Sequence, residues 1–275
     1  PYTTLFRSSR TYCVYLRESG YKFKKIIVVD FFHNSKKYKL LRSIFGEKIS
    51  RLWMCKNRPL WPDYKAYSTY FDAVQVGNVE HVIDYIEPFN FSDYTDKVEY
   101  YGCENYDDKK FHCFLKKQDH KVFLYTNGGI VPHDLLGDET VKFLHIHPGI
   151  VPQVRGSDGL LWSVLERGKP GVSCFYMDPG IDTGKLIKQE EFDLPAIDMP
   201  PPQNAEQEDI FYRSLLIAYD PHLRASLFRN IVSSCEGKGL DLLQTSNTNN
   251  KHCESFLWMH PKLRQRIISD LCVVK

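Results

Sequence analysis

The chain has 275 residues, of which 43% are hydrophobic and 25% charged, the composition of an ordinary globular protein. Its 36 Lys and Arg against 34 Asp and Glu leave a formal charge of +2, too balanced to indicate a nucleic-acid partner. No apolar run approaches the roughly 18 residues that a membrane helix needs, so the sequence predicts no membrane contact. With no visible signal peptide, we expect a cytoplasmic protein.

The cysteines and the first residues each suggest one further expectation. The eight cysteines are scattered without a Cys-x-x-Cys pair, which indicates reduced thiols rather than a zinc cage or a disulfide framework. Residues 1–8, PYTTLFRS, read like the translation of a common sequencing adapter. We therefore interpret residues 1–8 as an artefact, exclude them from the fold, and expect the true N-terminus to be missing.

The first third of the chain gives few clear elements. An apolar, β-branched run predicts a buried strand over 24–32. Helical spacing over 36–45 predicts a helix that ends at Gly46. The remaining assignments are a strand over 49–55, a loop over 58–70, a short helix over 79–86 and no decision for 90–109.

From residue 109 onward, strand and helix patterns alternate with short turns. Helical patterns lie near 111–115, 135–136 and 160–166, and strand patterns lie over 122–125, 143–146, 172–177 and 185–192. Such alternation implies βαβ units, and hence an α/β fold with a mostly parallel sheet and helices on both faces.

The last eighty residues have a different pattern. Three consecutive prolines mark 196–208 as a linker, and 210–233 is predicted helical with a break near Asp220-Pro221. A polar loop over 236–256 precedes a final amphipathic helix opened by Pro261. We therefore divide the chain into an α/β domain over 9–195 and a linker with a mainly helical appendage over 196–275.

Titratable side chains gather where the central strands end. His145 and His147 are two positions apart, so they share one face of a strand, and Asp182 follows a later strand. Because ligands of parallel sheets bind beyond the carboxyl ends of the strands, these groups and residues 127–131 are expected to converge. A histidine with a carboxylate can serve as a general acid or base, or as an oxyanion donor.

Other interpretations of these residues stay open at this point. Two histidines on a strand are often only structural. His145, His147 and Asp182 are also a valid set of metal ligands. Asp178, on the same loop as Asp182, is predicted to be a turn former rather than a catalytic residue.

The segments HPGIVPQVRG and PGVSCFYMDPGIDTGKLI, together with VFLYTNGGIVPHDLL upstream, resemble the folate-dependent formyltransferases. That family carries Asn-x-His-Pro-Ser/Gly, a Leu-Pro-x-x-Arg-Gly-type loop, and a strand followed by Leu-Asp-Thr/Ala-Gly. The resemblance is good over 110–192 and weak before residue 100.

The resemblance implies a Rossmann-like fold and transfer of a formyl group from 10-formyltetrahydrofolate to an amine. By position, His147 matches the catalytic histidine and Asp182 the essential aspartate. The loop expected to bind the folate consists of Asn127, Gly128, Gly129, Ile130 and Val131.

One residue departs from the family pattern. His145 stands where the family has asparagine, and we include it among the catalytic residues as an alternative oxyanion donor. The departure keeps three alternatives open: hydrolysis of formyl-folate, a metal-dependent hydrolase through the two histidines, and a non-catalytic folate-binding relative. The C-terminal part does not resemble the β-rich domain of the tRNA-directed members, so the expected acceptor is a small amine such as an amino sugar.

Overall fold

The computed structural model describes most of the chain. The described residues are 5–31, 35–56, 90–103, 105–126, 129–194, 197, 200–235, 239–248, 253 and 255–272. The predicted loop over 58–70 and the predicted helix over 79–86 lie outside them.

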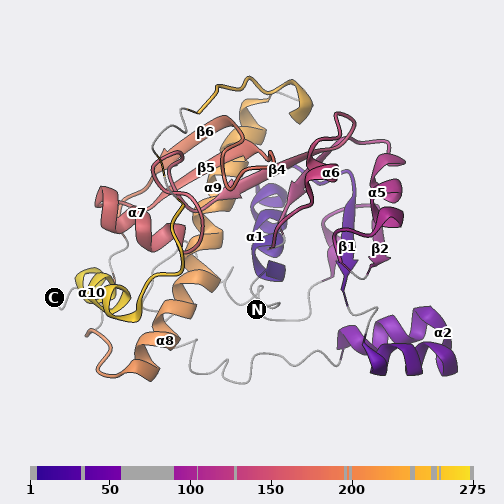
Figure 1. Cartoon of the computed structure of the whole chain (residues 1–275), viewed down its shortest axis with the longest axis horizontal. Coiled ribbons are helices and arrows are strands. Elements are labelled where there is room, and N and C mark those ends of the chain that lie inside the picture. Colours follow the sequence, from indigo (N-terminus) through magenta and orange to yellow (C-terminus); the bar gives the residue numbers. More distant parts are fainter. Residues whose placement is uncertain are drawn as a thin grey trace.

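Helices and strands alternate through the described residues, as the sequence predicts (Figure 1). The strands are β1 (Ile26–Asp30), β2 (Val98–Gly102), β3 (Val122–Tyr125), β4 (Lys142–His147), β5 (Gly171–Tyr176) and β6 (Lys185–Glu191). The helices of the first two thirds are α1 (Leu5–Glu18), α2 (Lys36–Lys56), α5 (Lys109–Lys116), α6 (His133–Leu136) and α7 (Gly159–Arg167). The C-terminal helices are α8 (Ala205–Ser214), α9 (Asp220–Ser234) and α10 (Pro261–Leu271), with a π-helical turn over Leu215–Tyr219 between the first two. Two short 3-10 turns cover Phe91–Asp93 and Leu240–Leu242.

The strands form two sheets. β1 pairs with β2 in parallel, and a second sheet has the order β3-β4-β5-β6. β3 and β4 are parallel, whereas β5 is antiparallel to both of its neighbours. The predicted α/β fold with mostly parallel strands and surrounding helices is confirmed. In the second sheet β3, β4 and β6 run in one direction, and β5 runs in the other.

The reversed direction of β5 has a local cause. The segment between β4 and β5 contains more than the helix α7. Residues 148–158 first fold against the end of β4, and α7 begins after them. β5 then returns along β4 with His147 opposite Ser173 and Leu144 opposite Tyr176. Alternating strand and helix signals cannot distinguish such a return from a parallel crossover.

β4 separates the core of this sheet from the site. Leu144 and Ile146 point to one face and are buried in the main apolar core. Phe143 belongs to a different apolar cluster, and His145 and His147 share its face because side chains alternate along a strand. The histidines therefore emerge on the face opposite the main core.

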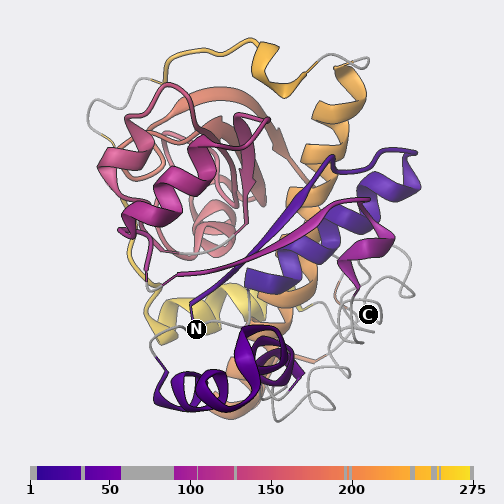
Figure 2. The ribbon, with the colours of Figure 1, turned by 90° about the vertical axis from the view of Figure 1, so that its right-hand side faces the viewer.

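The helices that follow β6 pack onto this same main core. Phe211 of α8, Phe228 of α9 and Ile268 of α10 are buried in one cluster with Leu144. Figure 2 shows α9 beside α1, and the two helices are in extensive contact. The predicted helical character of the C-terminal segment is confirmed, with the expected break located in the π-helical turn before Asp220.

Two expectations for the N-terminal third change. The predicted strand over 49–55 is wrong, because these residues continue α2 to Lys56. Ile49 and Trp53 are four residues apart and lie on one helical face, so this short apolar run fits both patterns. The helix does not end at Gly46 as predicted. Gly46 instead forms a kink inside α2, with a φ of 75°. The sequence gives no clear strand signal for β2, because Tyr100 and Tyr101 are adjacent and the strand has no alternation of apolar and polar residues.

The remaining general expectations concern cysteines and membranes. Seven cysteines are free thiols, namely Cys13, Cys103, Cys113, Cys174, Cys235, Cys253 and Cys272. Within those ranges, no helix combines the length and apolarity that crossing a bilayer requires. Helix α1 begins at Leu5, inside the stretch interpreted as an adapter, and that interpretation stays a prediction.

Phe228→Ala tests whether the C-terminal helices are part of the same cooperative unit as the sheet. Phe228 is 1% exposed and packs edge-on against Tyr12 of α1 at a ring-centroid distance of 5.6 Å. Its truncation should lower the free energy of unfolding by about 3–5 kcal/mol in a single denaturant transition. Leu242→Ala, at a side chain that is 69% exposed, is the matched control and should change it by less than about 0.5 kcal/mol. Separate transitions for sheet and helices would contradict a shared core.

Candidate active site

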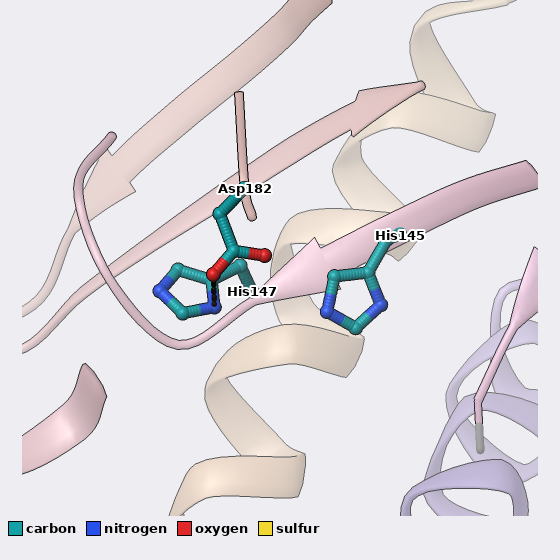
Figure 3. A group of neighbouring side chains, drawn as sticks. All are labelled: His145, His147 and Asp182. Atoms are coloured by element: carbon teal, nitrogen blue, oxygen red, sulfur yellow. Dashed lines mark ion pairs between the residues drawn. The ribbon is translucent and has the colours of Figure 1, made fainter. Parts of the chain in front are cut away.

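Three of the residues singled out from the sequence come together. Potential ligand atoms of His145, His147 and Asp182 all lie within 4.8 Å of one another. Figure 3 shows Asp182 above the end of β4, with the two imidazole rings on either side of it. The histidine pair and the loop after β5 therefore lie close together, as the sequence predicts.

His147 is held from two sides. Its Nε2 lies 3.2 Å from the carbonyl oxygen of Val154, and its Nδ1 lies 3.5 Å from Asp182 Oδ2. The side chain is only 4% exposed. Gly149 and Gly159 pack so closely that a Cβ at either would lie about 3 Å or less from the imidazole. The ring is therefore fixed in one orientation with Nδ1 toward the carboxylate.

Asp182 is presented by a tight turn. It adopts a left-handed backbone conformation with φ of 52°, which is uncommon for a residue other than glycine but is tolerated by aspartate. Asp178 accepts hydrogen bonds from Thr183 Oγ1 at 2.6 Å and from the Gly180 amide at 3.0 Å. Asp178 thus forms the turn, as expected for it, and leaves Asp182 to face the histidines.

A backbone amide that the sequence did not single out also contacts Asp182. The Gly156 N–H donates to Asp182 Oδ2 at 2.8 Å. Gly156 has a φ of 92°, and a Cβ there would collide with the carbonyl of Phe256. Both features require glycine, so the Arg-Gly step of the loop motif was the available sequence signal.

A C-terminal segment braces this loop from outside. Phe256 accepts a hydrogen bond from the Ser157 amide at 3.0 Å and donates one to the Arg155 carbonyl at 2.8 Å. Its ring stacks on Trp162 of α7 at a centroid distance of 4.3 Å. No local sequence pattern predicts this contact, since nearly a hundred residues separate Phe256 from the loop.

His145 differs from His147 in which nitrogen faces the site. Its Nδ1 lies 3.4 Å from the carbonyl oxygen of Tyr125 on β3, and its ring is half-buried between Tyr125 and Phe175. Only a protonated Nδ1 can donate to that carbonyl, so in the neutral ring Nε2 carries a lone pair. Burial lowers the pKa of His145 to about 4, with the charge of Asp182 opposing the shift. Figure 3 shows the second ring nitrogen turned toward His147 and Asp182.

The segment expected to hold the folate follows β3, beside the strand that carries the histidines. Asn127 and Gly128 lie outside the described residues. Gly129 is exposed and has a φ of 101°, and a Cβ there would contact only the Tyr106 ring, at 3.9 Å. Its carbonyl oxygen lies 3.3 Å from the Tyr125 hydroxyl. Val131 is buried and anchors the segment, whereas Ile130 is 81% exposed. Gly129 and Ile130 therefore present exposed backbone after the end of β3, the strand that pairs with β4.

The segment that contains this site is similar to proteins of known family. Residues 107–200 match the family model described as formyl transferase. Methionyl-tRNA formyltransferase from Syntrophus aciditrophicus is 33% identical over 69 residues, which are 25% of this chain and 22% of that protein. The enzyme of the same description from Rickettsia bellii is 38% identical over 75 residues, 27% of this chain and 25% of that protein. The matched region thus spans about a quarter of these relatives.

Similar solved structures extend over more of the chain at low identity. A 4-N formyltransferase from Francisella tularensis aligns with 90% of this chain and 86% of its own at 17% identity and a TM-score of 0.42. Methionyl-tRNA formyltransferase from Clostridium thermocellum covers 87% and 74% at 14% identity and a TM-score of 0.40. The resemblance seen in the sequence motifs is confirmed where the family model matches. Residues 107–200, the stretch that contains both histidines and Asp182, are thus the part of the chain that is similar to the formyl transferase family.

Proposed function

We propose that this site transfers a formyl group from 10-formyltetrahydrofolate to a small amine. The observation that carries the proposal is the pairing of buried His147 with Asp182 inside the formyl transferase segment. The exposed backbone around Gly129 supports a flat donor beside the pair.

His147 acts on the charge that develops at the formyl oxygen. Attack of the amine nitrogen on the formyl carbon forms the new C–N bond and moves an electron pair onto that oxygen. At 3.5 Å the contact of His147 Nδ1 with Asp182 is longer than a full hydrogen bond, so the Nδ1–H is available to the oxyanion. A neighbouring carboxylate stabilises an imidazolium in this role.

Asp182 completes the proton transfers. Its side chain is 15% exposed and has one oxygen fixed by the Gly156 amide, so the carboxylate faces the site in a set orientation. It takes the proton that the attacking amine loses, directly or through a water molecule. Collapse of the oxyanion then breaks the bond to the folate nitrogen, which leaves with the proton that Asp182 took from the amine.

We propose that the chemical role of His145 differs from that of the asparagine at this position in the family. An amide side chain offers N–H donors, whereas the neutral His145 ring offers the site a lone pair on Nε2. We therefore revise its proposed role from oxyanion donor to hydrogen-bond acceptor that orients the N–H of the attacking amine. A water molecule could be oriented in the same way, which makes hydrolysis of the donor the second candidate function.

An amino sugar is the acceptor that we put first. The formal charge of +2 over 275 residues gives little basic surplus for an RNA acceptor. Incubation with formyl-folate and a panel of amino sugars, other amines and initiator tRNA tests this choice, with mass-spectrometric detection of the formylated product. Release of formate without any amine would indicate hydrolysis instead.

His147→Ala and Asp182→Asn test the catalytic pair. Each should lower the turnover of formyl-folate by about 100-fold or more, because each removes a group that acts on charge or a proton in the reaction. His120→Ala, at an exposed loop position, is the control and should leave turnover unchanged. Full turnover in both site variants, with the fold checked by circular dichroism, would refute the assignment.

Gly156→Ala tests whether the backbone amide of the loop positions Asp182. The new Cβ meets the Phe256 carbonyl, so the amide must move away from the carboxylate. Gly168→Ala is the matched control, because Gly168 also has a positive φ, of 71°, but nothing lies within 4 Å of a Cβ there. Gly168→Ala should cost about 1–2 kcal/mol of stability from backbone strain. Gly156→Ala should cost more than this, because its Cβ must also displace the Phe256 carbonyl. Only Gly156→Ala should also lower kcat, by about tenfold or more; equal kcat values in the two variants would show that the amide has no such role.

A further inference from the structure

We propose that His145, His147 and Asp182 form a binding site for a divalent transition metal of the Zn²⁺ class. The site is created by the histidine that stands in place of the family's asparagine. Metal binding itself does not depend on the proposed formyl transfer, whereas its consequence, competition with that reaction, does.

The chemistry of the donor set favours Zn²⁺. Two imidazole nitrogens and one carboxylate oxygen are ligands that zinc accepts in catalytic sites, where three protein ligands leave a position for water. Magnesium and calcium prefer sites made of oxygen ligands alone. The set here offers one atom from each of three residues.

The free electron pairs point toward one another. His145 directs Nδ1 to the Tyr125 carbonyl, which leaves Nε2 for the site. His147 directs Nε2 to the Val154 carbonyl, which leaves Nδ1 for the site. Figure 3 shows these two remaining nitrogens turned toward the space next to the Asp182 carboxylate.

The same two carbonyls supply an outer shell. Histidine ligands in metal sites almost always donate their other ring N–H to a carbonyl, a carboxylate or water, which fixes the tautomer and the ring orientation. Tyr125 and Val154 have this relation to His145 and His147. Asp182 is likewise fixed by the Gly156 amide. Each ligand is thus oriented by a backbone group.

The spacing requires only a small contraction. Ligands about 2.0–2.1 Å from a tetrahedral Zn²⁺ lie about 3.4 Å from one another. The ligand atoms here lie within 4.8 Å of one another, and His147 Nδ1 and Asp182 Oδ2 are already 3.5 Å apart. The remaining contraction concerns His145, whose half-buried ring closes it by a small side-chain rotation.

Binding would change what the pair can do. A metal takes the Nδ1 lone pair of His147 and an oxygen of Asp182, so the Nδ1–H is no longer available to an oxyanion. On the proposed function, Zn²⁺ is therefore a reversible inhibitor. An asparagine at position 145 would leave only two strong ligands and no such site.

Titration calorimetry and equilibrium dialysis with ZnCl₂ test the proposal on chelator-treated protein without donor or acceptor. The wild-type protein should bind one Zn²⁺ per chain. The affinity of His145→Asn for Zn²⁺ should be lower by about 100-fold, since even an outer-shell partner contributes about 10–100-fold. Asp182→Asn provides a second variant with the same expectation. His120→Asn makes the same exchange at an exposed loop position and should keep wild-type affinity.

Cobalt substitution identifies the ligands independently of the seven described free thiols. Co²⁺ in the proposed site should give visible absorption of a tetrahedral nitrogen and oxygen site, without thiolate charge transfer, and His145→Asn should abolish it. Equal Zn²⁺ affinity in wild type and His145→Asn, or no stoichiometric binding by wild type, overturns the proposal. Metal binding without formyl transfer in any assay would uphold it and refute the proposed function instead.

Discussion

The register of β4 is the constraint on which the site depends. Its edges are paired with β3 and β5, so only the alternation of its side chains decides what faces the core. Leu144 and Ile146 are buried beneath the C-terminal helices, which commits His145 and His147 to the opposite face. A slip of one residue would place imidazoles in the apolar core and expose two large side chains, at a cost of several kcal/mol. Burial of the apolar side chains of β4 therefore determines the face on which the two histidines lie.

Once β4 is fixed, close packing rather than an open cleft shapes the surroundings of His147. Gly149 and Gly159 lie against the ring, and Ser173 of β5 donates to the Gly149 carbonyl at 2.6 Å. Ser173 also accepts from the Val151 amide at 3.1 Å, so one buried hydroxyl fixes two points of the loop. The loop reaches Asp182 through Gly156, which joins the histidine and the carboxylate in one hydrogen-bonded unit.

Sequence patterns predicted those features that depend on interactions between residues close together in the chain. The strands and helices between 109 and 192, the pairing of His145 with His147, and the turn formed by Asp178 all follow from spacing within a few residues. The direction of β5 did not follow, because an antiparallel return and a parallel crossover present the same alternation. Nor did the contact of Phe256 with Gly156, which joins residues a hundred positions apart. Residues 49–55 failed for another reason, since a short apolar run satisfies both helical and strand periods.

The replacement of an amide by an imidazole changes the electrostatic requirement of the whole site. With asparagine, the site would contain a neutral donor beside a histidine and a carboxylate. With His145, the Tyr125 carbonyl engages Nδ1 and leaves a lone pair facing a second imidazole and an anion. Converging electron pairs in a half-buried place are unfavourable unless a donor or a cation satisfies them. The amine of the proposed reaction and the proposed metal would both meet this requirement. If both proposals hold, the two compete for the same electron pairs, and the affinity for one sets the concentration at which the other can act.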